Sequence, residues 1–407
     1  MAEDLKVFPV KDLSQGIFSE VAPIQIPPGG AQPGTNNAIW LNGYLRPRPG
    51  MGLKYGGGSA TTTIKSLPIY KQPNLPDTIF RARLDSPSSI TLDSLISFTP
   101  SSTVWTQHAS SHTIAYGAYH LPWCNFSNKL FIAGLEYTLG FNGAAFTVDS
   151  QQPNAAFKIP KNAKIVAAGD SRLFIADHTN PDNNIRVPHR LSWSDFGAPY
   201  TWNGGEGAGT SGFLDLPRDS RAITGVVSNS AGLMVFTDRE TYFGVFVGLP
   251  EVYEIRGYTN NVGCLSHETI RSYKDGSYIW LGDDNVYMGA PGQQAIPIGD
   301  KIRIRMQQVC RLDWMYKSFA VIDHFNNLYH LVCPATATSD LTIMFTLNIK
   351  SGAWWESNFP YFSLCCGSEF RPNDWRGEPI MSGALGKVLD LGFEYPKDIG
   401  LPFSVDW

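Results

Sequence analysis

The stretch that decides the expected fold runs from residue 221 to residue 289. Its first part, residues 221–250, reads R-A-I-T-G-V-V-S-N-S-A-G-L-M-V-F-T-D-R-E-T-Y-F-G-V-F-V-G-L-P. An apolar run at 233–236 is followed by a polar turn and a second apolar run at 241–247. Short runs that are rich in β-branched and aromatic residues and bounded by Gly, Asn and Asp predict antiparallel strands joined by hairpins. We therefore expect residues 233–236 and 278–281 to be buried strands.

The same strand–turn–strand unit recurs along the chain. It repeats at 277–288, and six such units can be aligned on one apolar position in each, at Leu130, Leu173, Leu233, Ile279, Tyr329 and Ile380. The intervals of about 43 to 60 residues each suit one four-stranded blade. We predict an all-β fold, a β-propeller of about six or seven blades, with residues 63–70 and 89–98 as candidates for the seventh unit.

The propeller is expected over residues 51–395. Residues 1–50 predict an extended Pro/Gly-rich N-terminal arm that ends in a first hairpin, whose turn is Asn42-Gly43. The segment Arg46-Pro47-Arg48-Pro49-Gly50 is then expected to leave the sheet, and residues 396–407 form a C-terminal tail. One helix is expected at 300–316, although its first half alternates apolar and basic residues and could also be a strand.

Charge and composition limit the function classes. Of the 407 residues, 43% are hydrophobic, 13% aromatic and only 17% charged, and the formal net charge is -4. A general nucleic-acid binder needs a basic surface, which this balance argues against. A surface with few charges favours burial in an assembly.

Cysteine and targeting signals are weak. The six cysteines have no C-x-x-C spacing, so neither a zinc site nor a disulfide framework is expected. No signal peptide or membrane span is recognised, and synthesis in a reducing cytoplasm is expected.

No catalytic or cofactor motif was found. The glycine-rich run at 204–212 lacks the Lys-Ser/Thr ending of a phosphate loop, and the histidines lack metal-ligand spacing. Asp195 and the Asp283-Asp284 pair suit hairpin turns, in which Asp bonds its own backbone. We therefore expect no catalytic, cofactor-binding or metal site, and no cofactor.

Three residues of the early hairpin are candidate assembly contacts: Trp40, Arg46 and Arg48. The two arginines could reach a partner or a DNA phosphate. The alternative, of equal weight, is that they are solvated arginines held beside two prolines.

Four segments resemble the tail nozzle and packaged-DNA stabilisation (head-to-tail plug) proteins of short-tailed bacteriophages. The first three are N-G-Y-L-R-P-R-P-G at 42–50, I-T-G-V-V…L-M-V-F-T-D-R-E-T-Y-F at 223–243 and G-C-L-S-H-E-T-I at 263–270. The fourth is L-S-W-S-D-F-G-A-P-Y-T-W at 191–202. The match at 223–243 is partial. Thr241 stands where the family has a small residue, and the glutamate, Glu240, precedes that position. The similarity covers most of residues 36–300.

This resemblance implies a β-propeller that forms a sixfold ring in a virion. Such a homohexamer would lie in the phage tail and contact portal or adaptor proteins and tail tip or fibre proteins. It would retain the packaged double-stranded DNA without sequence-specific binding and pass it on ejection, with no enzymatic activity and no membrane contact. The alternative is a β-propeller glycan-binding protein or glycoside hydrolase, whose carboxylates would come from different blades and converge on the central axis.

Overall fold

The structure is a computed structural model of the chain. It describes residues 14–20, 25–27, 30–32, 36–41, 44–55, 63–73, 77–86, 88–99, 102–115, 118–136, 138–143, 146–148, 160–202, 209–217, 221–249, 251–259, 261–274, 276–338, 340–359, 363–370, 377–383, 386–392 and 398. The described residues form an all-β fold, as the sequence predicts.

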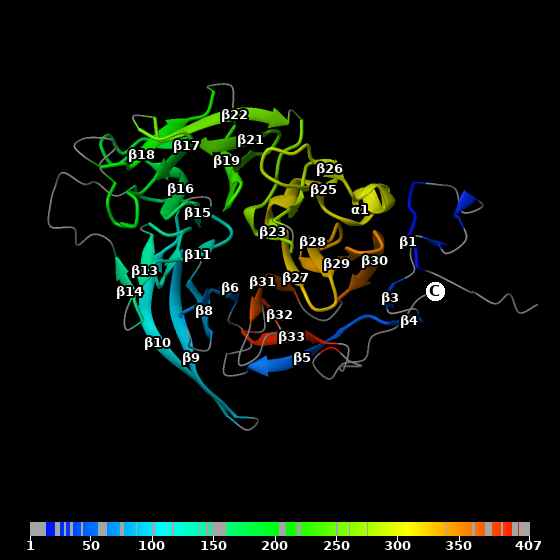
Figure 1. Ribbon diagram of the computed structural model, residues 1–407. Coiled ribbons are helices and arrows are strands. Elements are labelled where there is room, and N and C mark those ends of the chain that lie inside the picture. Colours follow the sequence, from blue (N-terminus) through cyan, green and yellow to red (C-terminus); the bar gives the residue numbers. More distant parts are fainter. Residues whose placement is uncertain are drawn as a thin grey trace, which may run out of the picture.

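Four antiparallel sheets of four strands follow one another in the middle of the chain (Figure 1). Within each sheet the strands pair in sequence order. The first two sheets consist of β11 (Trp123–Phe126), β12 (Lys129–Ile132), β13 (Leu139–Phe141) and β14 (Phe146–Val148), and of β15 (Ile165–Gly169), β16 (Arg172–Thr179), β17 (Arg186–Trp193) and β18 (Gly212–Asp215). The next two consist of β19 (Ile223–Asn229), β20 (Gly232–Thr237), β21 (Thr241–Phe246) and β22 (Tyr253–Thr259), and of β23 (Arg271–Ser272), β24 (Tyr278–Leu281), β25 (Val286–Gly289) and β26 (Ile296–Pro297).

A five-stranded sheet precedes these four. It consists of β6 (Ile64–Ser66), β7 (Ile69–Tyr70), β8 (Thr78–Ser86), β9 (Ser89–Thr99) and β10 (Ser102–Thr113). The candidate seventh unit at 63–70 and 89–98 is therefore made of strands, but the strand between its two segments, β8, was not predicted.

The last sheet has ten strands, of which eight form two antiparallel groups of four. One group is β27 (Phe319–Asp323), β28 (Leu328–Pro334), β29 (Leu341–Asn348) and β30 (Ala353–Asn358). The other is β31 (Leu364–Phe370), β32 (Glu378–Gly383), β33 (Val388–Gly392) and β5 (Gly50–Tyr55). The two groups pair with each other only at Leu341 and Leu364 within the described residues.

Strand β20 explains why the apolar runs are continuous rather than alternating. Leu233 and Val235 face a core shared with β15–β18, whereas Met234 and Phe236 face a core shared with β23–β26. Successive side chains of a strand point to opposite faces, so a strand covered on both faces needs apolar residues at every position. All four residues of β24 are likewise buried. The prediction of buried strands at 233–236 and 278–281 is confirmed.

All the sheets pack face to face with their neighbours in sequence order. Each four-stranded group shares one hydrophobic core with the sheet before it and a second core with the sheet after it. A further core joins Ile64, Leu67 and Ile79 of the first sheet to Ile380 and Val388 of the last. The first and last sheets of this series are thus packed against each other.

Residues 50–55 correct the expected path of the N-terminal region. We expected the chain to leave the sheet at Arg46–Gly50, but β5 begins at Gly50 and pairs antiparallel with β33. Figure 1 shows the blue β5 lying beside the red β33, although hundreds of residues separate them. The expected boundary at residue 51 therefore falls inside a strand.

The hairpin expected before this point is present as β3 (Ala38–Leu41) and β4 (Tyr44–Pro47). The Asn42-Gly43 turn between them lies outside the described residues. Two short strands of the expected arm, β1 (Gly16–Ile17) and β2 (Gly30–Ala31), pair in parallel, and β1 continues onto the edge of β30.

The predicted helix at 300–316 is divided into three parts. A 3-10 turn at Asp300–Ile302 leads into α1 (Arg303–Val309), and a second 3-10 segment, η5, covers Leu312–Lys317. Ile302, Met306 and Met315 pack into the core between β23–β26 and β27–β30. This burial explains Ile302 and Met306, two of the alternating apolar positions that allowed a strand as the alternative, whereas the third, Ile304, is exposed.

Several predicted features lie outside the described residues: arm residues 1–13, the first part of the glycine-rich run at 204–212, and the C-terminal tail 396–407 apart from Asp398. Within the part of the chain that is described, no helix is long and apolar enough to span a membrane.

Candidate functional site

The first strands of successive sheets lie next to one another around the middle of the molecule. Strand β15 contacts both β11 and β19, and β27 contacts both β23 and β31. Strand β31 also contacts β6, and Figure 1 shows these strands gathered round a common centre. Residues at the ends of these strands line two cavities.

Cavity A has a volume of about 260 Å³ and is lined by residues from several sheets. Its walls are mostly apolar, with Ile165, Ile223 and Leu265 among them. Its polar residues are Tyr119, His120, Lys164, Asp177, Arg186, Thr224, Ser266, His267 and Tyr316. A concave, largely apolar site with a few convergent polar groups is the usual form of a binding pocket.

The charges within cavity A are centred on Asp177. Its Oδ2 lies 2.6 Å from Nη2 of Arg186 and 3.3 Å from Nζ of Lys164, and the Asp177 side chain is almost fully buried. Two cations therefore share one carboxylate.

Cavity B, of about 290 Å³, also includes His267, so the two cavities meet at this residue. Its other functional side chains are Lys71, Trp123, Glu268, Arg271, His324 and Glu369. Arg271 is held by backbone oxygens, because its Nε donates to Ala320 O and its Nη1 to Ile270 O, both at 2.8 Å. Its Nη2 lies 3.1 Å from Oε2 of Glu268, and His324 Nε2 lies 3.6 Å from Oε2 of Glu369.

Protonation states in the two cavities follow from burial and from these ion pairs. Burial alone would raise the pKa of Glu268, but the Arg271 guanidinium and the neighbouring imidazoles hold that pKa below its ordinary value. Burial lowers the pKa of His267, and it lowers the pKa of His120 to about 4. At neutral pH Glu268 is therefore ionised and both histidines are uncharged.

This electrostatic arrangement suits binding better than acid catalysis. A general acid at neutral pH needs a raised carboxyl pKa, whereas that of Glu268 is lowered. Within the described residues, no three or more His, Cys, Asp or Glu side chains are grouped so that they could hold a metal ion.

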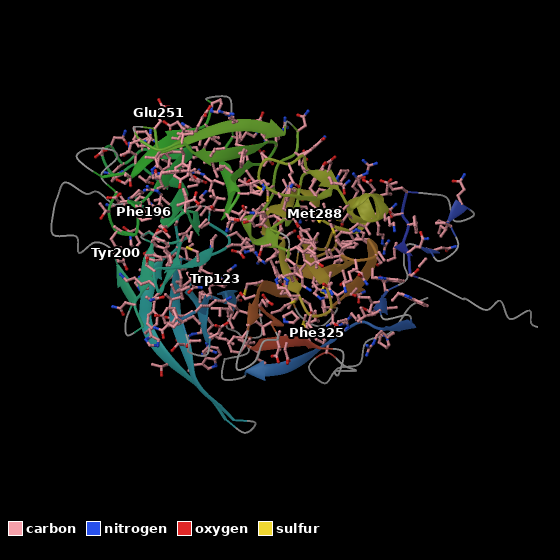
Figure 2. The ribbon with its side chains drawn as sticks, viewed as in Figure 1. Trp123, Phe196, Tyr200, Glu251, Met288 and Phe325 are labelled. Atoms are coloured by element: carbon pink, nitrogen blue, oxygen red, sulfur yellow. The ribbon has the colours of Figure 1, made fainter. Side chains whose placement is uncertain are left out.

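A second candidate site is an exposed apolar patch, which we call the rim patch: Phe196, Phe246, Val247 and Leu249. Phe196, Phe246 and Leu249 are 66%, 57% and 71% exposed. Tyr253 and Arg172 link Phe246 to Phe196. The Tyr253 ring lies 5.8 Å from the Phe246 ring, and the Tyr253 hydroxyl interacts with Arg172. The Arg172 guanidinium lies 5.8 Å from the Phe196 ring. Figure 2 shows Phe196 at the periphery of the molecule and Trp123 of cavity B near its middle. Apolar side chains exposed together in this way mark interaction surfaces.

The three candidate assembly contacts lie apart from both cavities. Trp40, on β3, is half-buried and packs against a core that contains Ile17 and Trp355. Arg46, on β4, is also half-buried. Arg48 is 2% exposed and is bonded within the chain to Asn37, Pro49 and Asp398. A partner or a DNA phosphate could reach Arg48 only if this part of the chain opened.

The cavity residues were missed because they come from different sheets. His267 and Glu268 lie within the segment at 263–270, and the histidines of the chain have no metal-ligand spacing that would single out His267. His120 and Glu369, which share these cavities, are more than a hundred residues away in sequence and carry no spacing signal. Asp283 and Asp284 lie in the turn between β24 and β25, as expected. Asp195 lies in the long connection between β17 and β18 rather than in a hairpin turn, and it accepts hydrogen bonds from the backbone N–H groups of Phe196 and Thr210.

Comparison with known proteins gives a likeness of fold alone. No protein-family model and no curated protein matches the chain. Among solved structures, an extracellular domain attributed to a hybrid two-component system of B. thetaiotaomicron aligns over 84% of this chain with a TM-score of 0.50 and 9% identity. The surface component PorZ of the Porphyromonas gingivalis type-IX secretion system aligns over 88% of this chain with a TM-score of 0.44 and 10% identity. The chain spans only 39% and 40% of the lengths of these two proteins.

Proposed function

We propose that the sheets form a β-propeller of seven blades, whose last blade is β31–β33 completed by β5. Two observations support this count. The strands fall into seven consecutive groups, each sharing cores with its two neighbours, and the first and last groups share the core that contains Ile64 and Ile380. Pairing β5 with β33 covers the edge of β33 and completes the last group of four with a strand from the other end of the chain.

We propose further that the chain is a structural subunit of a short-tailed phage tail, the nozzle, in which six copies ring the DNA channel. The observation that carries this proposal is the rim patch, because four large apolar side chains exposed together require a partner surface in a stable assembly. In a closed ring each subunit uses two different surfaces, one for each neighbour, and the rim patch supplies one of them.

Two of the segments that resemble the nozzle family, at 191–202 and 223–243, fit this role, since they supply residues of β17 and of β19 to β21. Gly263 lies where β21–β22 meets the next sheet, and a Cβ there would lie 2.2 Å from the backbone carbon of Asp238. Trp193 packs beneath Gly212 and Tyr253 in the sheet interior. The lumen of the ring would hold double-stranded DNA without sequence-specific contacts, and the ring would adjoin portal or adaptor proteins on one side and tail tip or fibre proteins on the other.

Light scattering coupled to size-exclusion chromatography, with negative-stain microscopy of the same fractions, tests this proposal. The purified full chain should elute at a multiple of its 44.9 kDa mass and give rings with a central opening. A strict monomer over the whole accessible concentration range would overturn it.

One observation favours a second candidate function, glycan binding in cavity B. Trp123 and Tyr278 line this cavity together with Glu268, Glu369 and Arg271. Aromatic faces and planar hydrogen-bonding side chains suit a sugar ring. Titration of the full chain with defined oligosaccharides, comparing wild type with Trp123→Ala, tests it: saturable heat that the variant loses would support binding, and no heat would exclude it.

A further inference from the structure

Two lysines that do not themselves line cavity A lie against the ring of Tyr119, which does, and we call this edge of the cavity its mouth. Nζ of Lys65, on β6, lies 4.4 Å from the ring centre of Tyr119, and Nζ of Lys317, in η5, lies 5.0 Å from it. Cation–π contacts stabilise each ammonium individually, but two cations at one ring also repel each other. Burial, followed by repulsion from Lys65 and Arg311, lowers the pKa of Lys317, while the Asp340 carboxylate acts in the opposite direction.

The interior of cavity A has the same excess of positive charge. Lys164 and Arg186 share the single carboxylate of Asp177. Nε2 of His120, which also lines the cavity, is buried, and burial lowers the pKa of this imidazole to about 4, so that it adds no positive charge at neutral pH.

Segment η5 adds exposed apolar and aromatic surface on one side of the opening, where Tyr316 lines the cavity. Leu312 and Tyr316 of η5 are 54% and 48% exposed, and the Tyr316 ring packs edge-on against Tyr119 at 6.1 Å. The Nζ atom of Lys317 lies over the ring of Trp314 in the same segment, 3.1 Å from the centre of that ring. The opening therefore combines positive charge with apolar contact area.

We infer that cavity A binds an acidic side chain of a peptide segment supplied by a partner protein. The carboxylate would lie between Lys65 and Lys317 at the mouth, and the residues on either side of it would pack on Leu312 and Tyr316. The volume of about 260 Å³ accommodates one or two side chains. Its apolar walls and the net charge of -4 favour a peptide over a nucleic-acid strand, which needs a continuous basic surface.

This site is separate from the rim patch and does not depend on ring formation. The rim patch lies on β21, on the following turn and on the loop after β17, whereas cavity A opens between the first strands of the sheets and η5. A monomeric chain could therefore still bind the peptide, and a ring could fail to bind it.

Fluorescence anisotropy of a labelled peptide on the full chain tests the inference. The probe is the heptapeptide Ala-Leu-Glu-Ala-Glu-Leu-Ala, and its matched control carries Gln in place of both Glu residues. We expect the Glu peptide to bind at least about tenfold more tightly than the Gln peptide and to weaken as salt is raised through about 0.5 M. Equal affinity of the two peptides, or no binding by either, would overturn the inference.

Two variants locate the binding. Lys65→Gln combined with Lys317→Gln should reduce affinity for the Glu peptide by about tenfold or more. Lys350→Gln, an exposed lysine in the turn between β29 and β30, should leave the affinity unchanged. Circular dichroism of each variant confirms that it is folded. An unchanged affinity in the folded double variant, or tighter binding of a labelled oligothymidylate than of the Glu peptide, would contradict an acidic-peptide site at this mouth.

Discussion

Arg48 and Asp398 form a buried ion pair between residues that lie 350 positions apart in the chain. Nη1 of Arg48 donates to Oδ1 of Asp398 at 2.8 Å, and a second bond joins Nη2 to Oδ2. The guanidinium also lies 4.3 Å from the ring centre of Phe359 and donates to the backbone oxygen of Asn358. Because Arg48 lies two residues before β5, this pair holds in place the strand that pairs the N-terminal region with β33.

Breaking this pair should destabilise the whole fold. In the Arg48→Met variant, the Asp398 carboxylate stays buried without its charged partner. In the Asp398→Asn variant, the Arg48 guanidinium stays buried without its charged partner. Either change should lower the free energy of unfolding by about 3–5 kcal/mol, since the remaining charge is left uncompensated. Urea unfolding followed by tryptophan fluorescence measures this loss, and the double variant should lose less than the two single losses combined.

The matched control is Arg256→Gln, which breaks an exposed ion pair with Glu254 on β22. Its unfolding midpoint should equal that of the wild type, because exposed pairs contribute little. If the Arg48 and Arg256 variants had the same midpoint, the buried pair would not be what secures β5.

Gly263 should tolerate no side chain, although it belongs to an ordinary-looking segment. A Cβ at this position would lie 2.2–2.4 Å from backbone atoms of Asp238 and Arg239, and backbone atoms cannot rotate away. We expect Gly263→Ala to cost several kcal/mol, at the upper end of the ~1–3 kcal/mol that is typical of overpacking. Gly244→Ala is the graded control, because its closest neighbours at 3.1–3.2 Å are side-chain atoms of Leu233, which can shift. Thermal unfolding of the two variants should rank them in this order, and equal losses would contradict the backbone clash.

The strand pattern could be predicted from the sequence because the strands are covered on both faces. At 233–236 and 278–281 every residue is apolar, and the turns between strands carry Gly, Asn or Asp. The hairpin of β15 and β16 shows why such turns can be recognised: its central residues Asp170 and Ser171 both have positive φ, as a tight two-residue turn requires.

Strand β5 and the cavities could not be predicted, for two different physical reasons. Strand β5 follows a Pro-rich segment that predicts an exit from the sheet, and its partner β33 is specified only by the three-dimensional packing. Residues such as His120, His267 and Glu369 meet because several sheets converge at the centre, and convergence leaves no spacing in the sequence. The composition gives the number of aromatic residues, but it does not indicate which of them, such as Phe196 and Phe246 of the rim patch, are exposed.

Buried histidines should make stability fall as pH is lowered. Burial lowers the pKa of His178 to about 4, and its Nε2 lies 2.8 Å from the Ser192 hydroxyl. The folded pKa lies below the unfolded value of about 6.5, so the unfolded state binds the extra proton between about pH 6.5 and about pH 4. The contribution of His178, of order 3 kcal/mol, is therefore fully present above about pH 6.5 and is lost progressively down to about pH 4.

The variant His178→Gln isolates this contribution, because a glutamine amide can keep the bond to Ser192 but does not titrate. Urea midpoints measured at several pH values across this window should fall less steeply for the variant than for the wild type. Parallel curves would mean that His178 takes up its proton at the same pH in the folded and unfolded chains, and that its burial does not govern the acid sensitivity.

The rim patch should control assembly without contributing to the fold of the single chain. Phe246→Ser combined with Leu249→Ser removes two side chains that are more than half exposed, so the urea midpoint of the monomer should stay close to that of the wild type. Burying each side chain against a partner would be worth about 1.5–3 kcal/mol, so losing both should weaken each subunit contact by about a hundredfold or more. Light scattering should then find monomers at concentrations where the wild type forms rings. Phe325→Ser, which removes an exposed phenylalanine from the turn between β27 and β28, is the matched control and should assemble normally. If the double variant assembled as well as this control, the apolar surface on β21 and its turn would not be the contact between subunits.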